Sequence, residues 1–171
     1  MAAAGMFILS GAWGLELGTR FSDTTAGNFP STSTQAQRLT RLTFYTNNDS
    51  NNRLIQGYDA YFNGNQTVRG PPSIYDGAVG VTLDLASDEV ITQVQLSRRT
   101  DLNGISSVEV TTSKGKSFVA GAVSGVRQVL KAPVGWRVVG FHGASYTSAI
   151  TLNGANRYPI PKLGVICAPA L

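Results

Sequence analysis

One segment near the C-terminal end combines aromatic rings with amide and guanidinium groups. Tyr146 and Tyr158 offer flat apolar faces for a pyranose ring, and Asn153, Asn156 and Arg157 donate hydrogen bonds to hydroxyl groups. The same composition suits a decorated surface loop or an oligomer contact. The sequence therefore predicts a ligand site in this segment, with those two alternatives left open.

Two other polar segments lie between runs of β-forming residues. The first covers residues 47–56 and contains Asn52 and Gln56, and the second contains Asp101 and Asn103. Their amide and carboxylate groups are also able to bind hydroxyls. Asn-rich turns are common for another reason, since Asn tolerates left-handed backbone. We treat these four residues as second and third candidate sites.

The residues that usually perform catalysis or hold metals are sparse. His142 is the only histidine, and no acidic residue follows Glu109. One His, the single Cys167 and no clustered acids do not form a metal-ligand set. The chain also lacks a Gly-x-Ser-x-Gly elbow and a phosphate-binding loop. We expect His142 to be structural, no catalytic residue, no metal site, no cofactor and no enzymatic activity.

Basic residues dominate the final third of the chain, and the net charge is +4. This skew is able to attract sulfated glycans or lipid headgroups. The basic residues are spaced singly, unlike the runs in nucleic-acid-binding arms, so scattered solvated side chains are the first interpretation and no nucleic-acid partner is expected. They are Lys114, Lys116, Arg127, Lys131, Arg137, Arg157 and Lys162.

Length and composition indicate one all-β domain covering residues 1–171. Only 14% of residues are charged, and the nineteen glycines suit short strands joined by tight turns. The lone Cys167 excludes an intrachain disulfide and is expected to be a buried thiol. The apolar residues 1–10 lack a positive flank and are too short to span a bilayer, so we expect no transmembrane segment and a protein that is cytoplasmic or released without a signal peptide.

A layout of strand, polar loop and strand occurs three times, over residues 42–62, 90–112 and 138–166. This repetition predicts three similar sheets in a three-fold arrangement rather than a two-layer sandwich. Asn63-Gly64 is a strong hairpin signal between two of the expected strands. Residues 69–80, which include Pro71-Pro72 and three glycines, are expected to be irregular.

Several motifs together resemble the jacalin-related lectins. They are Gly11-Ala-Trp-Gly14, Ile91-Thr-Gln-Val94, Val110-Thr-Thr-Ser-Lys-Gly-Lys-Ser-Phe118, Val138-Val-Gly-Phe-His-Gly143 and Leu163-Gly-Val-Ile166. The resemblance runs from about residue 11 to residue 166. It implies β-prism I, with three four-stranded antiparallel sheets and pseudo-three-fold symmetry. It also implies a single jacalin-like lectin domain that binds glycans or glycoproteins without metal or catalysis. We expect such a lectin to gain avidity as a homo-oligomer.

The resemblance also implies where a sugar would lie, between a glycine-rich N-terminal loop and the loop after the Phe-His-Gly strand. Gly14 and Leu15 belong to the first loop, and Gly143, Tyr146, Thr147 and Ser148 belong to or flank the second. The family's Gly-x-x-x-Asp pattern supplies a carboxylate to sugar hydroxyls. The residue in that place here is Pro161 or Ser148, according to the alignment, while Gln56 and Ser106 stand there in the other two repeats.

Three functions remain open at this point. The first is a lectin that binds glycans through loops at the strand ends. The second is a sugar-blind interaction or assembly module on the same fold. The third is a binder of anionic sulfated glycans or lipid headgroups.

Overall fold

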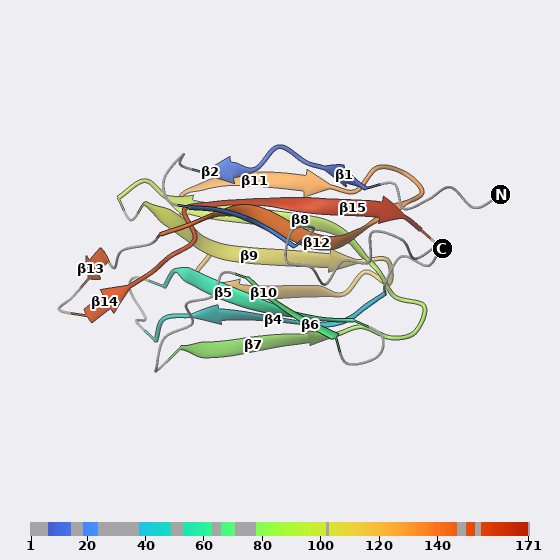
Figure 1. Ribbon diagram of the computed structural model, residues 1–171, viewed down its shortest axis with the longest axis horizontal. Helices are drawn as coiled ribbons and strands as arrows, with labels where there is room; N and C mark the ends of the chain where they lie inside the picture. The colour runs from blue at the N-terminus through green and yellow to red at the C-terminus, as the bar shows by residue number, and fades with distance from the viewer. Residues whose placement is uncertain are drawn as a thin grey trace.

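A computed structural model shows the fold of the protein and describes residues 7–14, 19–23, 38–48, 53–62, 66–70, 78–101, 103–146, 150–152 and 155–170. Every regular element in these ranges is a β-strand, and each strand pairs antiparallel with its neighbours (Figure 1). The all-β prediction is therefore confirmed. Within these ranges there is no helix long and apolar enough to cross a membrane.

The strands from the middle of the chain form two sets of four. The β4–β7 sheet has the order β6-β5-β4-β7, and the β8–β11 group has the order β10-β9-β8-β11. The bounds of the first set are β4 (Leu39–Thr46), β5 (Ile55–Phe62), β6 (Gln66–Gly70) and β7 (Val79–Asp84). Those of the second set are β8 (Ile91–Arg99), β9 (Gly104–Thr112), β10 (Ser117–Gly121) and β11 (Val126–Lys131).

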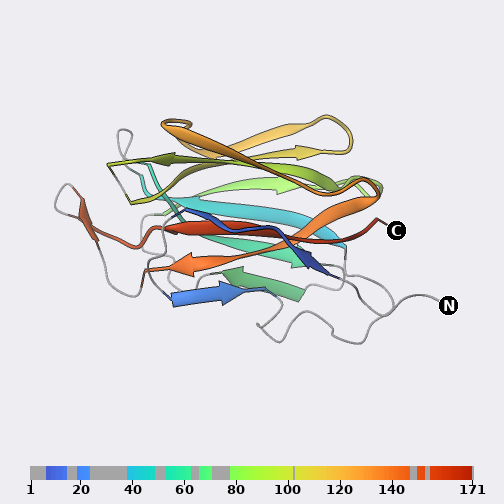
Figure 2. The same cartoon turned by 90° about the horizontal axis from the view of Figure 1, so that it is seen from above.

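The strands from the two ends of the chain form what we call the terminal group. Two short strands near the start of the chain lie along β15, which pairs with β12, which in turn pairs with β3. Figure 2 shows β15 (red), β12 (orange) and β3 (blue) side by side. The bounds are β1 (Ile8–Leu9), β2 (Trp13–Gly14), β3 (Thr19–Ser22), β12 (Trp136–Ser145) and β15 (Lys162–Pro169).

The same neighbour order recurs in all three sets. When the four strands of the β4–β7 sheet or the β8–β11 group are numbered along the chain, their order in space is third, second, first, fourth. The terminal group has the same order if β12 is counted as first, β15 as second, β1 and β2 together as third and β3 as fourth. The predicted hairpins over residues 42–62, 90–112 and 138–166 correspond to β4–β5, β8–β9 and β12–β15. The predicted sheets are not all separate, because one residue pair, Val138 with Ile91, joins the terminal group to the β8–β11 group in a nine-stranded sheet.

One local expectation needs correction, and one element was not expected. A two-stranded hairpin, β13 (Ile150–Leu152) and β14 (Ala155–Arg157), stands within the last connection. Residues 69–80 are less irregular than expected, because residues 69 and 70 end β6 and residues 79 and 80 begin β7. Residues 71–77 lie outside the described ranges.

Alternating side chains explain why these segments form half-buried strands. In β8 and β9, Val94, Leu96, Val108 and Val110 are all fully buried. Glu109, between two of these valines, faces the other side of the sheet and is half-buried. A period of two places apolar residues on one face, which therefore packs into the core.

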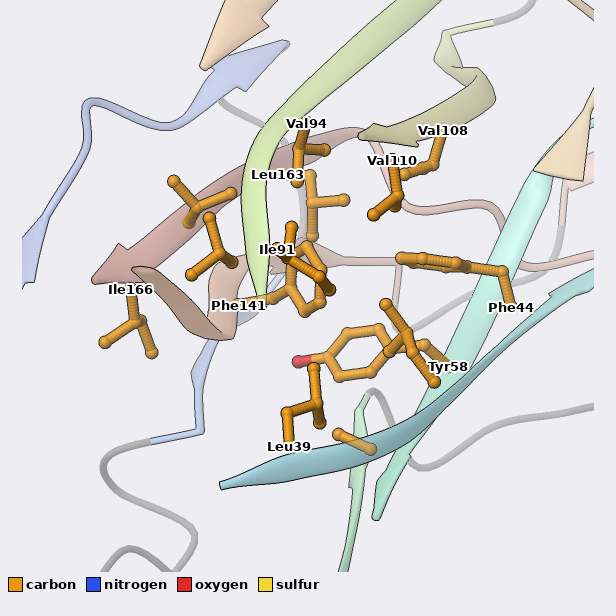
Figure 3. Close-up of a cluster of buried hydrophobic side chains, with 14 of the residues drawn as sticks. Leu39, Phe44, Tyr58, Ile91, Val94, Val108, Val110, Phe141, Leu163 and Ile166 are labelled. Atoms are coloured by element: carbon orange, nitrogen blue, oxygen red, sulfur yellow. The ribbon is translucent and has the colours of Figure 1, made fainter. Parts of the chain in front are cut away.

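Aromatic rings from different groups meet at the centre of the core (Figure 3). The ring centroids of Phe44 and Phe141 are 5.5 Å apart at an interplanar angle of 75°, and those of Tyr58 and Phe141 are 5.0 Å apart. Such tilted and edge-to-face contacts are the favoured geometry for aromatic pairs. Cys167 is also buried, as the sequence predicts.

Candidate functional site

Three hairpin connections meet at one end of the molecule, which we call the tip end. The backbone N–H of Ile160, in the β12–β15 connection, donates to the carbonyl oxygen of Ile55 at 2.8 Å. The carbonyl oxygen of Ile160 accepts from the N–H of Ile105, also at 2.8 Å. Ile55 and Ile105 lie at the starts of β5 and β9, so one residue ties the three hairpins together. The β13–β14 hairpin projects beyond this end (Figure 1).

Two glycines permit the close approach of segments at the tip end. A Cβ atom on Gly104 would lie 2.8 Å from the Cβ of Pro159, and one on Gly14 would lie 2.1 Å from the carbonyl oxygen of Pro161. Gly14 also has a φ of 136°, a backbone conformation that favours glycine. The N-terminal strands and the last connection are therefore in direct contact at Gly14.

The structure brings three of the predicted site residues close together. The Tyr146 hydroxyl donates to the carbonyl oxygen of Asn103 at 3.4 Å, and Asn103 adopts a left-handed φ of 44°. Asp101, two residues earlier, pairs with Arg99 at 2.5 Å. Burial raises the pKa of Tyr146, so its hydroxyl remains a donor at neutral pH. This cluster presents a ring, a carbonyl, an amide and an ion pair to solvent.

The other predicted residues of the last connection are only partly described. Tyr158 is half-buried next to the buried Pro159. Asn156 and Arg157 lie in β14, where they pair in register with residues 151 and 150. Gly143 lies in β12 opposite Leu163. Leu15, Asn52, Thr147, Ser148 and Asn153 fall outside the described residues.

Gln56 does not lie where a surface ligand would reach it. Its exposed fraction is 1%, and Ser106, which follows Ile105 as Gln56 follows Ile55, is fully buried. The hairpin tip is closed above β5 by Asn47, whose Oδ1 accepts from the N–H of Leu54 at 2.6 Å. The side chain of Gln56 is therefore enclosed in the fold, and its contact with sugar hydroxyls stays a prediction.

His142 has a structural position, as the sequence predicts. Its Nε2 lies 2.9 Å from the carbonyl oxygen of Ser10, which can only accept, so this nitrogen carries the proton. Burial lowers the pKa of His142, and the bond to Ser10 opposes that shift. Among the described residues, no three His, Cys, Asp or Glu side chains gather in a way that would hold a metal ion.

Sequence reasoning did not foresee that two cationic residues of the terminal group lie near Gly143. Arg20 lies in β3, Lys162 begins β15, and both line a surface hollow beside Gly143. Lys162 was noted only as part of the basic final third of the chain. Arg20 carried no signal in the sequence, because strand pairing alone brings it near a residue 142 positions away.

Comparison with known proteins identifies the family. The model of the jacalin-like lectin domain matches residues 10–155. The chain belongs to this family. No curated protein matches the chain in sequence.

Solved structures of lectins share the fold across nearly the whole chain. The mannose-binding lectin from champedak superposes with a TM-score of 0.61 at 18% identity and 100% coverage of both chains. The Calystegia sepium agglutinin gives a TM-score of 0.67 at 18% identity, with 96% of this chain and 98% of that chain covered. A complex of artocarpin with mannotriose gives 0.62 at 18% identity, with 96% and 97% covered. At this identity the likeness establishes the β-prism fold.

Proposed function

We propose that this protein is a lectin that binds glycans through the tip end, without a metal and without catalysis. Membership of the jacalin-like lectin domain family is the observation that carries this proposal. The convergence of three connections through Ile160 supports it, because loops held by a rigid sheet are suited to binding. Ligands would be glycans or glycoproteins.

The contacts proposed for a sugar are a ring and neutral polar groups. Tyr146 offers a partly exposed ring, and Asn103 offers an exposed amide beside it. A pyranose stacks its apolar face on such a ring while its hydroxyls bond to amides and carbonyls. Asp101 adds a carboxylate, but the Arg99 guanidinium pairs with it and lowers its pKa. We therefore place Tyr146 at the centre of the site.

Mannose-containing glycans are the first ligands to test, because the champedak relative is a mannose-binding lectin and artocarpin was solved with mannotriose. The carboxylate that the family pattern supplies is replaced by Pro161 or Ser148 in this chain. A carboxylate gives stronger, charge-assisted bonds than an amide. We therefore expect weak binding to single sugars, and we propose that homo-oligomers raise the avidity.

A glycan array followed by calorimetric titration with mannotriose tests this function. Tyr146→Ala should weaken binding of the best arrayed neutral glycan by about tenfold, since it removes the stacking surface. Val134→Ser is the matched control, because Val134 is fully exposed in the turn before β12, at the opposite end of that strand. Silence of the folded protein on every arrayed glycan would contradict the proposal and favour a sugar-blind interaction module.

A further inference from the structure

One face of the terminal group carries two cations on the same cross-strand row. Lys162 of β15 pairs with Gly14 of β2 and with Ala144 of β12, and Ala144 pairs with Arg20 of β3. The next row includes Leu163, which is fully buried, and Phe21, which packs against the core. Because side chains alternate along a strand, Lys162 and Arg20 face outward.

Two adjoining hollows, each with a volume of about 330 Å³, lie on this outward face. Both are lined by Arg20, His142 and Gly143, so they form one continuous groove. One hollow extends towards Leu9 and Ser22, and the other extends along residues 10–12 to Lys162. We call this the outer-face groove. It begins at the row that borders the tip end.

The wall of the groove is fixed in place. His142 lies over Gly164, where a Cβ atom would come within 2.5 Å of its Nε2, and that nitrogen bonds the carbonyl oxygen of Ser10. Ser10 is fixed in turn, because its hydroxyl accepts from the N–H of Val165 at 2.9 Å. The ring is thus held between β12 and the N-terminal strands and gives the groove a preformed side.

Arg20 is the cation of this groove that the described acidic residues leave unpaired. Arg20 is exposed, and none of the described carboxylates forms an ion pair with it. Five of the seven described acids pair with other cations, namely Asp59, Asp84, Asp88, Glu89 and Asp101. Glu109 bonds Gln95 and Ser117 in the β8–β11 group, and Asp23 faces the core.

We propose that the outer-face groove binds the sulfate or carboxylate groups of an acidic saccharide, with Arg20 and Lys162 as the anion-binding residues. Arginine suits this role because its planar fork donates two parallel hydrogen bonds to an oxyanion. Lys162 and Arg20 are two strands apart, which is roughly 10 Å, so a chain lying over Ala144 reaches both. The backbone of residues 10–12 adds polar groups for hydroxyls.

The choice of a saccharide rests on the proposed lectin function, since the groove continues from the tip end. An anionic membrane offers the same headgroup charge, but it is a flat surface, and the groove is a hollow with only one exposed large apolar residue, Leu9, in its lining. Binding to a membrane is therefore the alternative that the experiment must distinguish.

The test is calorimetric titration with a heparin-derived tetrasaccharide and with its desulfated form. The double variant Arg20→Gln, Lys162→Gln should bind the sulfated form about tenfold more weakly than the parent, since each cation makes charge-assisted bonds. The control Arg127→Gln, Lys131→Gln removes the same charge from β11, where both residues are exposed, and should change affinity by less than about twofold. Parent binding should weaken between about 50 mM and about 200 mM NaCl.

Equal losses in the two double variants would overturn the proposal, because they would show that only net charge matters. So would equal affinity for the sulfated and desulfated forms, or binding confined to phosphatidylserine vesicles. Tyr146→Ala separates this site from the tip end. Loss of neutral-glycan binding in that variant, with sulfated binding retained, supports both sites. If no neutral glycan binds but the sulfated form binds through Arg20 and Lys162, the tip-end function fails and the groove stands.

Discussion

The outer faces of the β4–β7 sheet and the terminal group carry arginines in different electrostatic settings. In the β4–β7 sheet, Arg69 makes two bonds to the Asp59 carboxylate at 2.8 and 2.9 Å, and Arg41 pairs with Asp84 at 2.6 Å. In the terminal group, Arg20 faces outward without a described acidic partner. The first face therefore satisfies its own charges, whereas the second leaves a cation for a ligand.

Asp59 shows how complete the pairing is in the β4–β7 sheet. Its exposed fraction is 1%, and besides Arg69 it accepts from the Tyr45 hydroxyl at 2.8 Å. Burial and the Asp59 carboxylate raise the pKa of Tyr45 to about 12, so the hydroxyl stays a donor. A buried carboxylate with three such bonds is a structural element, which contrasts with the exposed guanidinium of Arg20.

The largest effect is expected from Asp59→Ala. This change leaves the Tyr45 hydroxyl and the Arg69 guanidinium without their acceptor, and we expect the free energy of unfolding to fall by about 2–3 kcal/mol. Urea denaturation of the parent and the variant measures this difference in the free energy of unfolding. Asp59→Asn keeps one acceptor oxygen and should lose less. A loss below about 1 kcal/mol for Asp59→Ala would break the comparison, because the pairing would then be dispensable.

The next effect concerns the one described acid of the terminal group, Asp23, which follows β3 and lies inside. Its carboxylate accepts from the Tyr58 hydroxyl at 2.5 Å and from the N–H of Phe141 at 2.7 Å. Burial raises its pKa from 3.8 to about 6, against the lowering effect of those bonds. The folded state therefore binds this proton more tightly than the unfolded state, and stability falls as pH rises from about 3.8 to about 6.

Between about pH 5 and about pH 7.5, this single group should lower the free energy of unfolding by roughly 1–2 kcal/mol. Asp23→Asn should remove that decrease while its amide bonds the same two partners. Parallel denaturation curves of parent and variant at the two pH values provide the measurement. An identical pH dependence in both proteins would show that the Asp23 carboxyl does not titrate in this window.

Arg41→Gln should have a small effect. The Arg41 and Asp84 side chains are 51% and 67% exposed, and solvent screens such pairs strongly. We expect a barely measurable loss of stability, with a similarly small coupling in a double-mutant cycle with Asp84→Asn. A clearly measurable coupling would mean that this surface pair contributes more to the fold than its exposure suggests.

Arg20→Gln should have the smallest effect on stability. No described ion pair involves Arg20, so the free energy of unfolding, measured by thermal denaturation, should change by less than about 0.5 kcal/mol. Asp59→Ala serves as the matched reference on the other sheet. A loss of more than about 1 kcal/mol would erase the contrast between the two faces, because Arg20 would then be a structural residue.

The sequence predicted the parts of the fold that depend on local pattern. Alternation in the segments around Val94 and Val108 indicated strands, and three polar loops indicated three hairpins, all of which occur. The junction of Val138 with Ile91 was not predictable, since it depends on how two sheets meet in space.

The candidate site was less accessible to sequence reasoning. Composition identified Tyr146 and Asn103 as polar loop residues, and the contact between them arises only from the folded tip end. The burial of Gln56 was not foreseen, because the polar type of a residue does not report its exposure. Arg20 was missed because its importance comes from a row of paired strands, which a single stretch of sequence does not contain.

The position of Ile160 has a consequence for how this end of the molecule varies and moves. Its backbone N–H and carbonyl oxygen bond two other hairpins at once, so no connection is able to swing away without breaking a bond to another. If these bonds break only together, the amide hydrogens of Ile105 and Ile160 should exchange slowly and at similar rates. Residues inserted away from these two hydrogen bonds do not disturb the three hairpins. This explains how the β12–β15 connection contains the additional β13–β14 hairpin while the β4–β5 and β8–β9 connections stay short.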